Sequence, residues 1–246
     1  MAGNRTFHVI ILTDRNQIIL INKPYRWTSF DVVKKIRSAF LKKLRAESSD
    51  EKVRFKVGHA GTLDPLATGL LILCTGNKTK DIGRIQDAEK EYTGSIHMGV
   101  FSESYDYERE LIKHEDIAEL DPAKVEEVRM SFLGEQFQIP PMHSAIKVEG
   151  KRAYELARQG NELELKARRI EIKEFEILGI ELLQIHFRIV CSKGTYIRSL
   201  ADDFGKRMGS RACLSSLSRT RIGEYLLTDA FQPSEFINQL SEYQSN

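Results

Sequence analysis

The stretch GLLILCTG, residues 69–76, is a continuous run of apolar residues between two glycines. A strand that is buried on both faces has this pattern, whereas a strand with one face in water alternates apolar and polar residues. Such a strand must be covered by other elements on both sides. The run therefore predicts an interior strand in a layered domain that contains both helices and strands.

Strand and helix patterns interleave along the rest of the chain, and no repeat or linker divides it. We therefore expect one domain over residues 1–246, with a core over about 18–228, of α/β or α+β class with a mixed sheet. Ser29 is expected to cap a helix, and Gly179 to lie at the turn between two strands. The expected strands span 17–24, 69–76, 92–100, 169–178 and 181–191, and the expected helices span 29–44, 123–134, 151–160, 195–209 and part of the tail after 228.

Composition excludes several classes of protein. The 246 residues contain no run of about 18 apolar residues, and Asp14 and Arg15 interrupt the N-terminal apolar run, so neither a spanning helix nor a signal peptide is expected. We expect a cytoplasmic protein that does not enter a membrane. Cys74, Cys191 and Cys213 are odd in number and far apart, which predicts reduced, mostly buried thiols and no metal clip.

Charge is unevenly distributed, although the formal net charge is only +2. Residues 34–56 hold nine Lys/Arg against three acidic residues, and residues 188–221 hold eight against two. Residues 101–135 instead hold eleven Asp/Glu against four Lys/Arg. This pattern is typical of a surface that binds a polyanion, with an acidic region elsewhere. Ordinary solvated helix faces would give similar counts, and the counts alone leave both interpretations open.

Asp64 is a lone carboxylate between glycine-rich sequence and the apolar run. Pro65 favours an extended Asp64, which would then cap a short helical turn that Gly69 could end. Helix capping is the default interpretation of an isolated Asp-Pro pair. However, glycines beside a lone acid at the end of an interior strand also indicate a binding crevice, and His59 adds a group that can stack or donate a hydrogen bond.

Several segments, in order along the chain, resemble motifs of the TruB-type tRNA pseudouridine synthases. The resemblance starts from GHAGTLDPLATGLLILCTGNKTK and covers most of residues 18–223. It implies a pseudouridine synthase fold, with a mixed, largely antiparallel central sheet and flanking helices. The other segments are LINKPYRWTSFDVVKKIR, KEYTGSIHMG, PPMHSAIKVEGKRAYELARQG, CSKGTYIRSLADDFG and LSSLSRTRIG.

The resemblance assigns an isomerase activity, in which the T-loop uridine of tRNA, position 55, becomes pseudouridine. It implies that Asp64 is the catalytic carboxylate and that the Arg198 guanidinium keeps it ionised. Tyr92 would stack on the flipped base and is a candidate for removing the C5 proton. Tyr196 and Leu217 would line the pocket, and His59 would occupy the space that the flipped base leaves. Core packing is the alternative role for each of these aromatic and leucine side chains.

The expected partner is the T stem-loop of tRNA, bound by a monomer without cofactor, metal or guide RNA. About two dozen residues follow IGEY, too few for a second core, so we expect a bacterial stand-alone form that lacks the C-terminal PUA domain. The basic segment 34–56 could then supply RNA affinity. The expected phosphate contacts are Lys23, Lys90, Lys147, Lys151, Arg152, Arg219 and Arg221.

Two other functions compete with this interpretation. One is a noncatalytic tRNA-binding protein that acts as a folding chaperone. The other is a nucleoside hydrolase or phosphorylase, which would need a water-activating base or a phosphate site that the sequence does not show. The presence of Asp64, Tyr92 and Arg198 together favours the isomerase.

Overall fold

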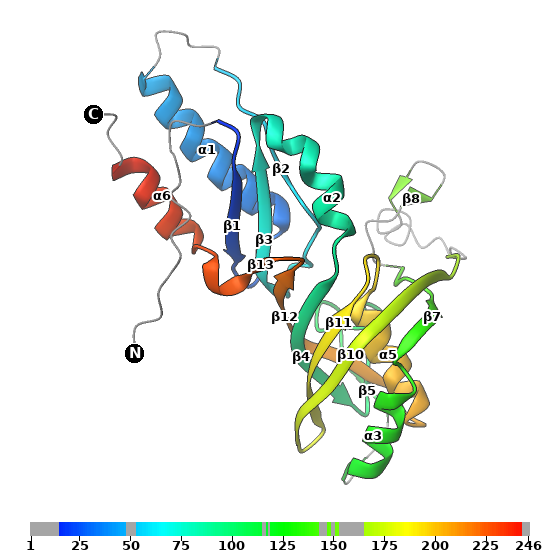
Figure 1. Ribbon diagram of the computed structural model, residues 1–246. Coiled ribbons are helices and arrows are strands. Elements are labelled where there is room, and N and C mark those ends of the chain that lie inside the picture. Colours follow the sequence, from blue (N-terminus) through cyan, green and yellow to red (C-terminus); the bar gives the residue numbers. More distant parts are fainter. Residues whose placement is uncertain are drawn as a thin grey trace, which may run out of the picture. The chain divides into compact units, whose positions relative to one another are not determined.

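A computed structural model describes residues 15–47, 53–114, 117, 119–142, 147–148, 151–152 and 165–242 (Figure 1). The chain divides into two compact units. Unit 1 comprises residues 1–90 and 218–246, and unit 2 comprises residues 91–217. The expectation of one domain over residues 1–246 stays a prediction.

Unit 1 is a small sheet with helices packed against it. Its strand order is β1-β3-β12, with β2 paired to β3 and β13 paired to β12. The β3–β12 pair is parallel, whereas β1–β3, β2–β3 and β12–β13 are antiparallel. In chain order the elements are β1 (Ile18–Lys23), α1 (Ser29–Glu47), β2 (Val57–His59), β3 (Thr68–Thr75), η1 (Gly76–Asp81), α2 (Ile82–Asp87), the end of β12 (Ala212–Ile222), β13 (Tyr225–Leu226), η2 (Leu227–Asp229) and α6 (Pro233–Glu242).

Unit 2 contains the strand order β12-β4-β11-β10-β7, with the first part of β12 as its edge. The β10–β11 and β10–β7 pairs are antiparallel. Together with unit 1 this confirms a mixed, largely antiparallel sheet with flanking helices. The elements are β4 (Lys90–Met98), β5 (Val100–Phe101), β6 (Ile112–Lys113), α3 (Pro122–Met130), β7 (Gly134–Gln138), β8 (Lys147–Val148), β9 (Lys151–Arg152), β10 (Arg168–Glu181), β11 (Gln184–Cys191) and α5 (Ile197–Arg207).

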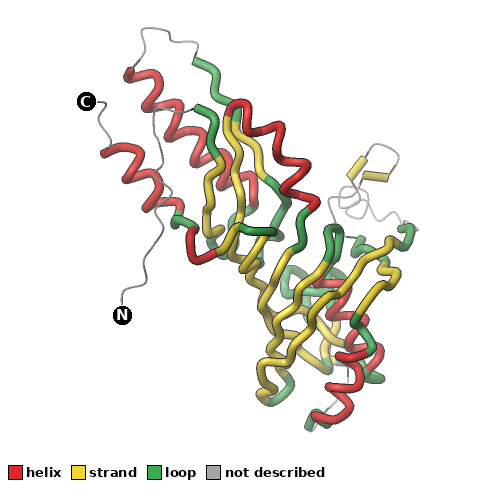
Figure 2. Tube along the Cα trace, in the orientation of Figure 1, coloured by secondary structure: helices red, strands yellow, loops and turns green. Residues whose placement is uncertain are grey.

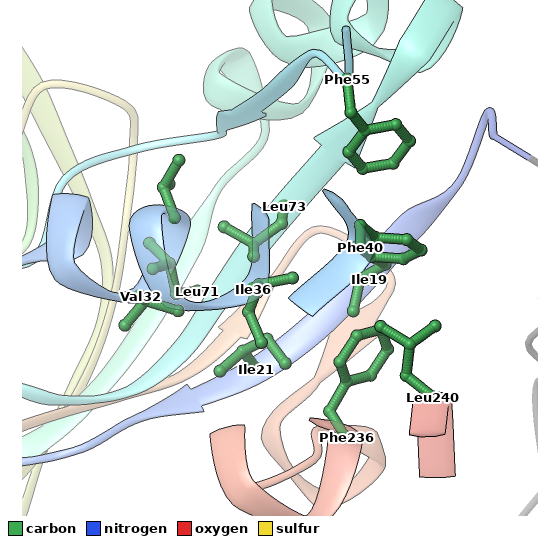
Figure 3. Close-up of a cluster of buried hydrophobic side chains, with 11 residues drawn as sticks. Ile19, Ile21, Val32, Ile36, Phe40, Phe55, Leu71, Leu73, Phe236 and Leu240 are labelled. Carbon is green, nitrogen blue, oxygen red and sulfur yellow. The ribbon is translucent and has the colours of Figure 1, made fainter. Parts of the chain in front are cut away.

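The apolar run does form an interior strand. Residues 69–75 of β3 are all buried, as a strand covered on both faces requires. One face of β1 and β3 packs against α1 and α6, which contact each other (Figure 2). The aromatic part of this cluster centres on Phe40, whose ring centroid lies 4.6 Å from that of Phe55 and 5.8 Å from that of Phe236 (Figure 3).

Helix α1 begins at Ser29, but Ser29 is not its cap. The Thr28 hydroxyl accepts a hydrogen bond from the Asp31 amide at 3.0 Å, and the Asp31 carboxylate accepts one from the Thr28 amide at 2.9 Å. This reciprocal pair is a capping box, with the acid three residues after the cap. The prediction that Ser29 caps the helix was therefore wrong by one residue, and the Ser29 hydroxyl is buried elsewhere.

The hairpin between β10 and β11 turns at Leu182 and Leu183, three residues after the expected Gly179. Glu181 pairs with Gln184, so the loop has two residues, and Leu182 adopts a positive φ of 52°. Gly179 instead pairs with His186 beside a register shift. A glycine at an irregularity inside a strand is a known alternative to a glycine in a turn. The sequence pattern did not separate the two.

The other expected elements are confirmed where the structure describes them. Strands β1 and β4, helices α3 and α5, and a C-terminal helix, α6, lie where the patterns place them, and all three cysteines are free and buried. The prediction of a helix over 151–160 was wrong at its first two residues, which form strand β9. Its remaining residues lie outside the described ones. Within the described residues, no helix is both long and apolar enough to cross a membrane.

The two phenylalanines of α1 should differ sharply in their contribution to stability. Phe40 is 3% exposed and Phe30 is 69% exposed. We expect Phe40→Ala to lower the free energy of unfolding by about 3–5 kcal/mol, because it leaves a cavity in the core. Phe30→Ala, on the same helix, should change it by less than about 0.5 kcal/mol. Denaturant unfolding followed by circular dichroism measures both, and equal losses would contradict the packing described.

Candidate active site

Asp64 lies in a β-turn and does not cap a helix. The Ala67 amide donates to the Asp64 carbonyl at 3.1 Å, and β3 begins at the next residue, Thr68. Pro65 occupies the second position of the turn, where its fixed φ is favourable. The prediction of a helical turn capped by Asp64 was therefore wrong, because the strand starts before a helix could form. Asp64 itself is half-buried.

Arg219, from β12, holds the segment that leads into this turn. Its side chain is 2% exposed, and its Nη2 and Nη1 donate to the carbonyls of Gly61 at 3.1 Å and Thr62 at 3.5 Å. Its Nε donates to the carbonyl of Leu70 in β3 at 2.9 Å. A rigid guanidinium with donors on two edges can connect two backbone segments in this way. Arg219 therefore ties the approach to Asp64 to the interior strand.

Lys23, at the end of β1, also bonds to the turn. Its side chain is 0% exposed. Nζ donates to three carbonyls, those of Pro24 at 3.0 Å, of Trp27 at 2.5 Å and of Pro65 at 3.3 Å. Burial lowers the pKa of Lys23 from 10.5 to about 8; the negative charge of Asp64 opposes this shift and the positive charge of Arg219 adds to it. Asp64 and two buried cations therefore share one electrostatic environment.

Ser29 fixes the residue immediately before Asp64. Its hydroxyl donates to the Leu63 carbonyl at 3.3 Å and accepts from the Leu63 amide at 2.9 Å. The Pro65 carbonyl also accepts from the Arg26 amide at 2.8 Å. Every backbone carbonyl from residue 61 to 65 thus has a hydrogen-bond donor. We define residues 61–67 as the Asp64 loop.

A close main-chain approach supports this arrangement. Gly69 has a φ of +100°, and a Cβ at this position would lie 2.4 Å from the Arg219 carbonyl oxygen and 2.6 Å from its nitrogen. The two residues are also register partners in the parallel β3–β12 pair. Only glycine fits here, because both the backbone angle and the distance exclude a side chain.

The expected phosphate contacts are placed differently from one another. Lys23 and Arg219 are buried and bonded to carbonyls, so in this structure they position the Asp64 loop and their side chains are not open to solvent. Lys90 is also buried, with Nζ on the Gln86 and Ala88 carbonyls, which corrects its assignment in the same way. Arg221 is partly exposed and pairs with Glu89 at 2.8 Å. Lys147 lies in β8 and Lys151 and Arg152 lie in β9, which pair antiparallel, and their side chains lie outside the described residues.

His59 is at the end of β2, paired with Leu73 of β3. Burial lowers its pKa, and the nearby Arg219 charge adds to this effect, while a contact with the Gly61 backbone opposes it. The imidazole is therefore neutral near pH 7. A neutral ring beside the Asp64 loop can pack against an uncharged partner without adding a further positive charge.

In unit 2, Arg198 is anchored at the start of α5. Its side chain is 3% exposed, and Nη1 donates to the Ser104 carbonyl at 3.1 Å. Its Nε lies 3.8 Å from the carboxylate of Asp106, which is also buried. The hydroxyls of Ser102 and Ser104 in turn donate to the Asp106 carbonyl. This network holds the guanidinium in one place, as a buried charge requires.

The remaining predicted residues of unit 2 lie on its strands and at the start of α5. Tyr92 is buried on β4, and Leu217 is partly buried on β12. Tyr196 precedes α5, and its backbone amide and carbonyl are held by the side chain of Gln138, at 2.8 Å and 3.0 Å. The residue before Ile197 is therefore fixed by a buried amide.

Sequence reasoning missed three residues that hold the predicted ones. Asp106 belongs to an acidic segment, so one buried acid among exposed ones gives no distinct pattern. Gln138 lies outside the segments that resemble the family motifs. Ser29 was noticed, but as a helix cap. In each case the role depends on a partner far away in sequence, at Arg198, Tyr196 and Leu63 respectively.

Comparison with known proteins agrees with the expected family. Residues 47–197 match the model of the TruB family pseudouridylate synthase (N terminal domain). The chain belongs to the TruB family. Two proteins named tRNA pseudouridine synthase B are close relatives. That of Parabacteroides distasonis is 48% identical over 92% of this chain and 94% of its own length, and that of Chlorobaculum tepidum is 46% identical over 95% and 94%.

Solved structures show the same fold for this TruB family member. A Cbf5–Nop10–Gar1 complex contains a chain that matches with a TM-score of 0.67 and 27% identity over 91% of this chain. An archaeal box H/ACA Nop10–Cbf5 complex matches with a TM-score of 0.64 at 23% identity, which bears on the fold alone. This chain spans about half of each of those longer chains, 54% in both cases. The expected pseudouridine synthase fold is confirmed.

The shifted pKa of Lys23 predicts a pH dependence of stability. In the folded chain Lys23 holds its proton less tightly, with a pKa of about 8 against 10.5 unfolded. Between these values the unfolded state carries more protons from this residue, so its contribution to the free energy of unfolding rises with pH, by at most about 3 kcal/mol. Below about pH 8 both states are protonated, and this contribution is flat.

The measurement compares wild type with Lys23→Met in denaturant unfolding at several pH values. The wild-type free energy of unfolding minus that of the variant should increase from pH 8 to pH 10 and stay constant from pH 6 to pH 7. Subtracting the free energy of the variant cancels the contributions of other groups that titrate in the same pH range. Parallel curves across the whole range would show that Lys23 titrates as it does in the unfolded chain.

Proposed function

We propose that this protein converts the T-loop uridine of tRNA, position 55, to pseudouridine. In this reaction the N1–C1′ bond breaks, a C5–C1′ bond forms, the C5 proton leaves and N1 gains a proton. Family membership and the names of the relatives support uridine isomerisation in tRNA. The observation that carries the proposal is a lone carboxylate, Asp64, on a loop whose carbonyls from residue 61 to residue 65 all accept hydrogen bonds.

Asp64 is proposed to act as the catalytic carboxylate. The reaction has no net redox change, and one carboxylate can attack the base or sugar or stabilise a cationic sugar. A nucleophile is effective when its backbone is fixed before the substrate arrives, because its orientation then costs little entropy during reaction. The bonds from Ser29, Lys23 and Arg219 to the Asp64 loop provide this rigidity.

The residues of unit 2 are proposed to complete the site. Arg198 would keep Asp64 ionised through a two-pronged ion pair, and Asp106 would hold Arg198 ready for it. Tyr92 would stack on the flipped uracil and is the candidate for C5 proton removal, with Tyr196 and Leu217 around it. Because Asp64 and these residues belong to different units, their meeting stays a prediction.

The enzyme is further proposed to act in the cytoplasm as a monomer, on tRNA alone. No guide RNA is needed in this scheme, although the similar Cbf5 chains belong to Nop10 complexes. The wild-type protein, mixed only with unmodified tRNA transcript, should therefore be active without any added RNA or protein.

Tritium release from tRNA labelled at uridine C5 tests the proposal directly. Wild type should release label, and Asp64→Asn should release it at least about 1,000-fold more slowly, because the amide cannot act as the nucleophile. Binding of tRNA, measured by filter retention, should change little. Asp229→Asn removes an exposed carboxylate of unit 1 and should release label at the wild-type rate.

Other outcomes would contradict specific parts of the proposal. Wild-type rates from Asp64→Asn would remove Asp64 from the mechanism. Binding without any release by wild type would indicate the noncatalytic tRNA-binding protein. Free uracil among the products would indicate a nucleoside hydrolase. Label release together with pseudouridine at a position outside the T loop would refute only the assignment of position 55 as the modified uridine.

A further inference from the structure

A groove that is not lined by Asp64 runs along α1 on the surface of unit 1. It has a volume of about 270 Å³ and is lined by α1 and by the segment that leads into β2. We define the α1 groove by Phe30, Val33, Lys34, Arg37, Phe55 and Lys56. Its volume is just below the roughly 300 Å³ at which small-molecule pockets begin, so it suits one or two ring-sized groups.

The floor of the groove is apolar and rigid. Val33 and Phe55 are buried members of the core cluster, and the Phe55 ring packs on Phe40 (Figure 3). Phe30, at the start of the groove, is 69% exposed. An exposed phenyl ring above a fixed apolar floor is a surface on which a flat, uncharged ring can stack.

The sides of the groove are cationic. Arg37 is held across it, because Nε donates to the Phe55 carbonyl at 2.9 Å. The side chains of Lys34 and Lys56 are exposed, and neither has a hydrogen-bond or salt-bridge partner among the described residues. The nearby Asp31 carboxylate accepts hydrogen bonds from the Thr28 amide and hydroxyl, at 2.9 Å and 2.6 Å, and its charge also interacts with that of Lys34. Three positive groups around an apolar floor therefore face solvent.

The groove begins at Phe30, one residue after a contact with the Asp64 loop. Phe30 directly follows Ser29, whose hydroxyl bonds both backbone groups of Leu63, next to Asp64. From Phe30 to Leu41, which also lines the groove, α1 rises about 16 Å at 1.5 Å per residue. Unit 1 therefore carries both the Asp64 loop and the groove, and the Ser29 contact with Leu63 lies directly before the first residue of the groove.

We propose that the α1 groove binds unpaired nucleotides of the RNA substrate, with bases on Phe30 and the apolar floor and phosphates on Lys34 and Lys56. The chemistry of the partner follows from the combination of features. Cations alone would suit any anion, and an apolar floor alone would suit any apolar group. Flat rings that alternate with phosphates, as in single-stranded RNA, satisfy both. This inference rests on the proposed function for the identity of the RNA.

The test compares two pairs of exposed lysines in unit 1. Lys34→Gln/Lys56→Gln removes the groove cations, whereas Lys35→Gln/Lys42→Gln removes two exposed lysines of α1 that do not line the groove. Both variants lose the same net charge. Filter binding of unmodified tRNA at several salt concentrations should show weaker binding by the groove variant, with a salt dependence shallower by about 1.4 in logarithmic slope. The control variant should keep nearly the wild-type affinity and slope.

The stacking part is tested without a change of charge. Phe30→Ala should weaken tRNA binding about five-fold or more, and Phe30→Trp should restore it. Ultraviolet cross-linking should attach wild-type Phe30 to an unpaired nucleotide. A fully paired RNA duplex should bind wild type and Phe30→Ala equally, because its bases are not available to the groove. These readouts need no turnover, so they remain informative if tritium release fails.

Several results would overturn the inference. Equal weakening by the two lysine pairs would show a diffuse electrostatic effect without a groove site. Unchanged tRNA affinity in Phe30→Ala, or a loss that Phe30→Trp does not restore, would exclude base stacking there. Binding of a polyglutamate peptide that depends on Lys34 and Lys56, with tRNA affinity unchanged, would assign the groove to an acidic protein segment.

Discussion

Hydrogen bonds from two buried cations to main-chain carbonyls hold the loop on which the rest of the site depends. Lys23 and Arg219 both donate to carbonyls of residues 61–65, and neither side chain is more than 2% exposed. Burying a charge is costly unless it is compensated, and here carbonyl oxygens and the nearby Asp64 carboxylate provide the compensation. The negative charge of Asp64 therefore helps to stabilise the buried cations, and the hydrogen bonds from these cations hold the backbone of the loop in place.

This design explains why the site residues are dispersed along the sequence. Lys23 ends β1 and Arg219 lies in β12, almost two hundred residues later, yet both bond to the short segment before β3. In unit 2 the same principle recurs, because Asp106 holds Arg198 and Gln138 holds the backbone of Tyr196. For the proposed isomerisation, which needs orientation and no redox chemistry, such fixed groups supply what the reaction requires.

Predictions from the sequence were correct for elements with a strong local pattern. They were wrong where the role of a residue depends on its contact with a residue far away in the sequence. The apolar run of β3, the α1 periodicity through Phe40 and the family motifs were sufficient for the fold and the family. Lys23 and Arg219 were taken for phosphate contacts, because a sequence shows that a residue is cationic but not that it is buried. Ser29 and Gly179 failed for a related reason. Each residue type has two common local roles, and only the partner, Leu63 or His186, distinguishes them.

The cations of the basic segment 34–56 are not equivalent, although the whole segment was expected to contribute to RNA binding. Lys34 and Lys56 border the apolar surface of the α1 groove, whereas Lys43 bonds the Leu240 carbonyl of α6 and pairs with Glu47. Charge counts along a sequence therefore overstate the number of residues that are available to a polyanion.

The close contact between Gly69 and the main chain of Arg219 makes position 69 unusually sensitive to mutation. Every missense mutation of a glycine codon adds a side chain, and even the single methyl group of alanine would collide with the main chain of Arg219. To make room, β12 would have to shift, and the guanidinium that holds Gly61 and Thr62 would move with it. A mutation that changes no charge would thus displace the Asp64 loop from a distance, through the spacing of two strands.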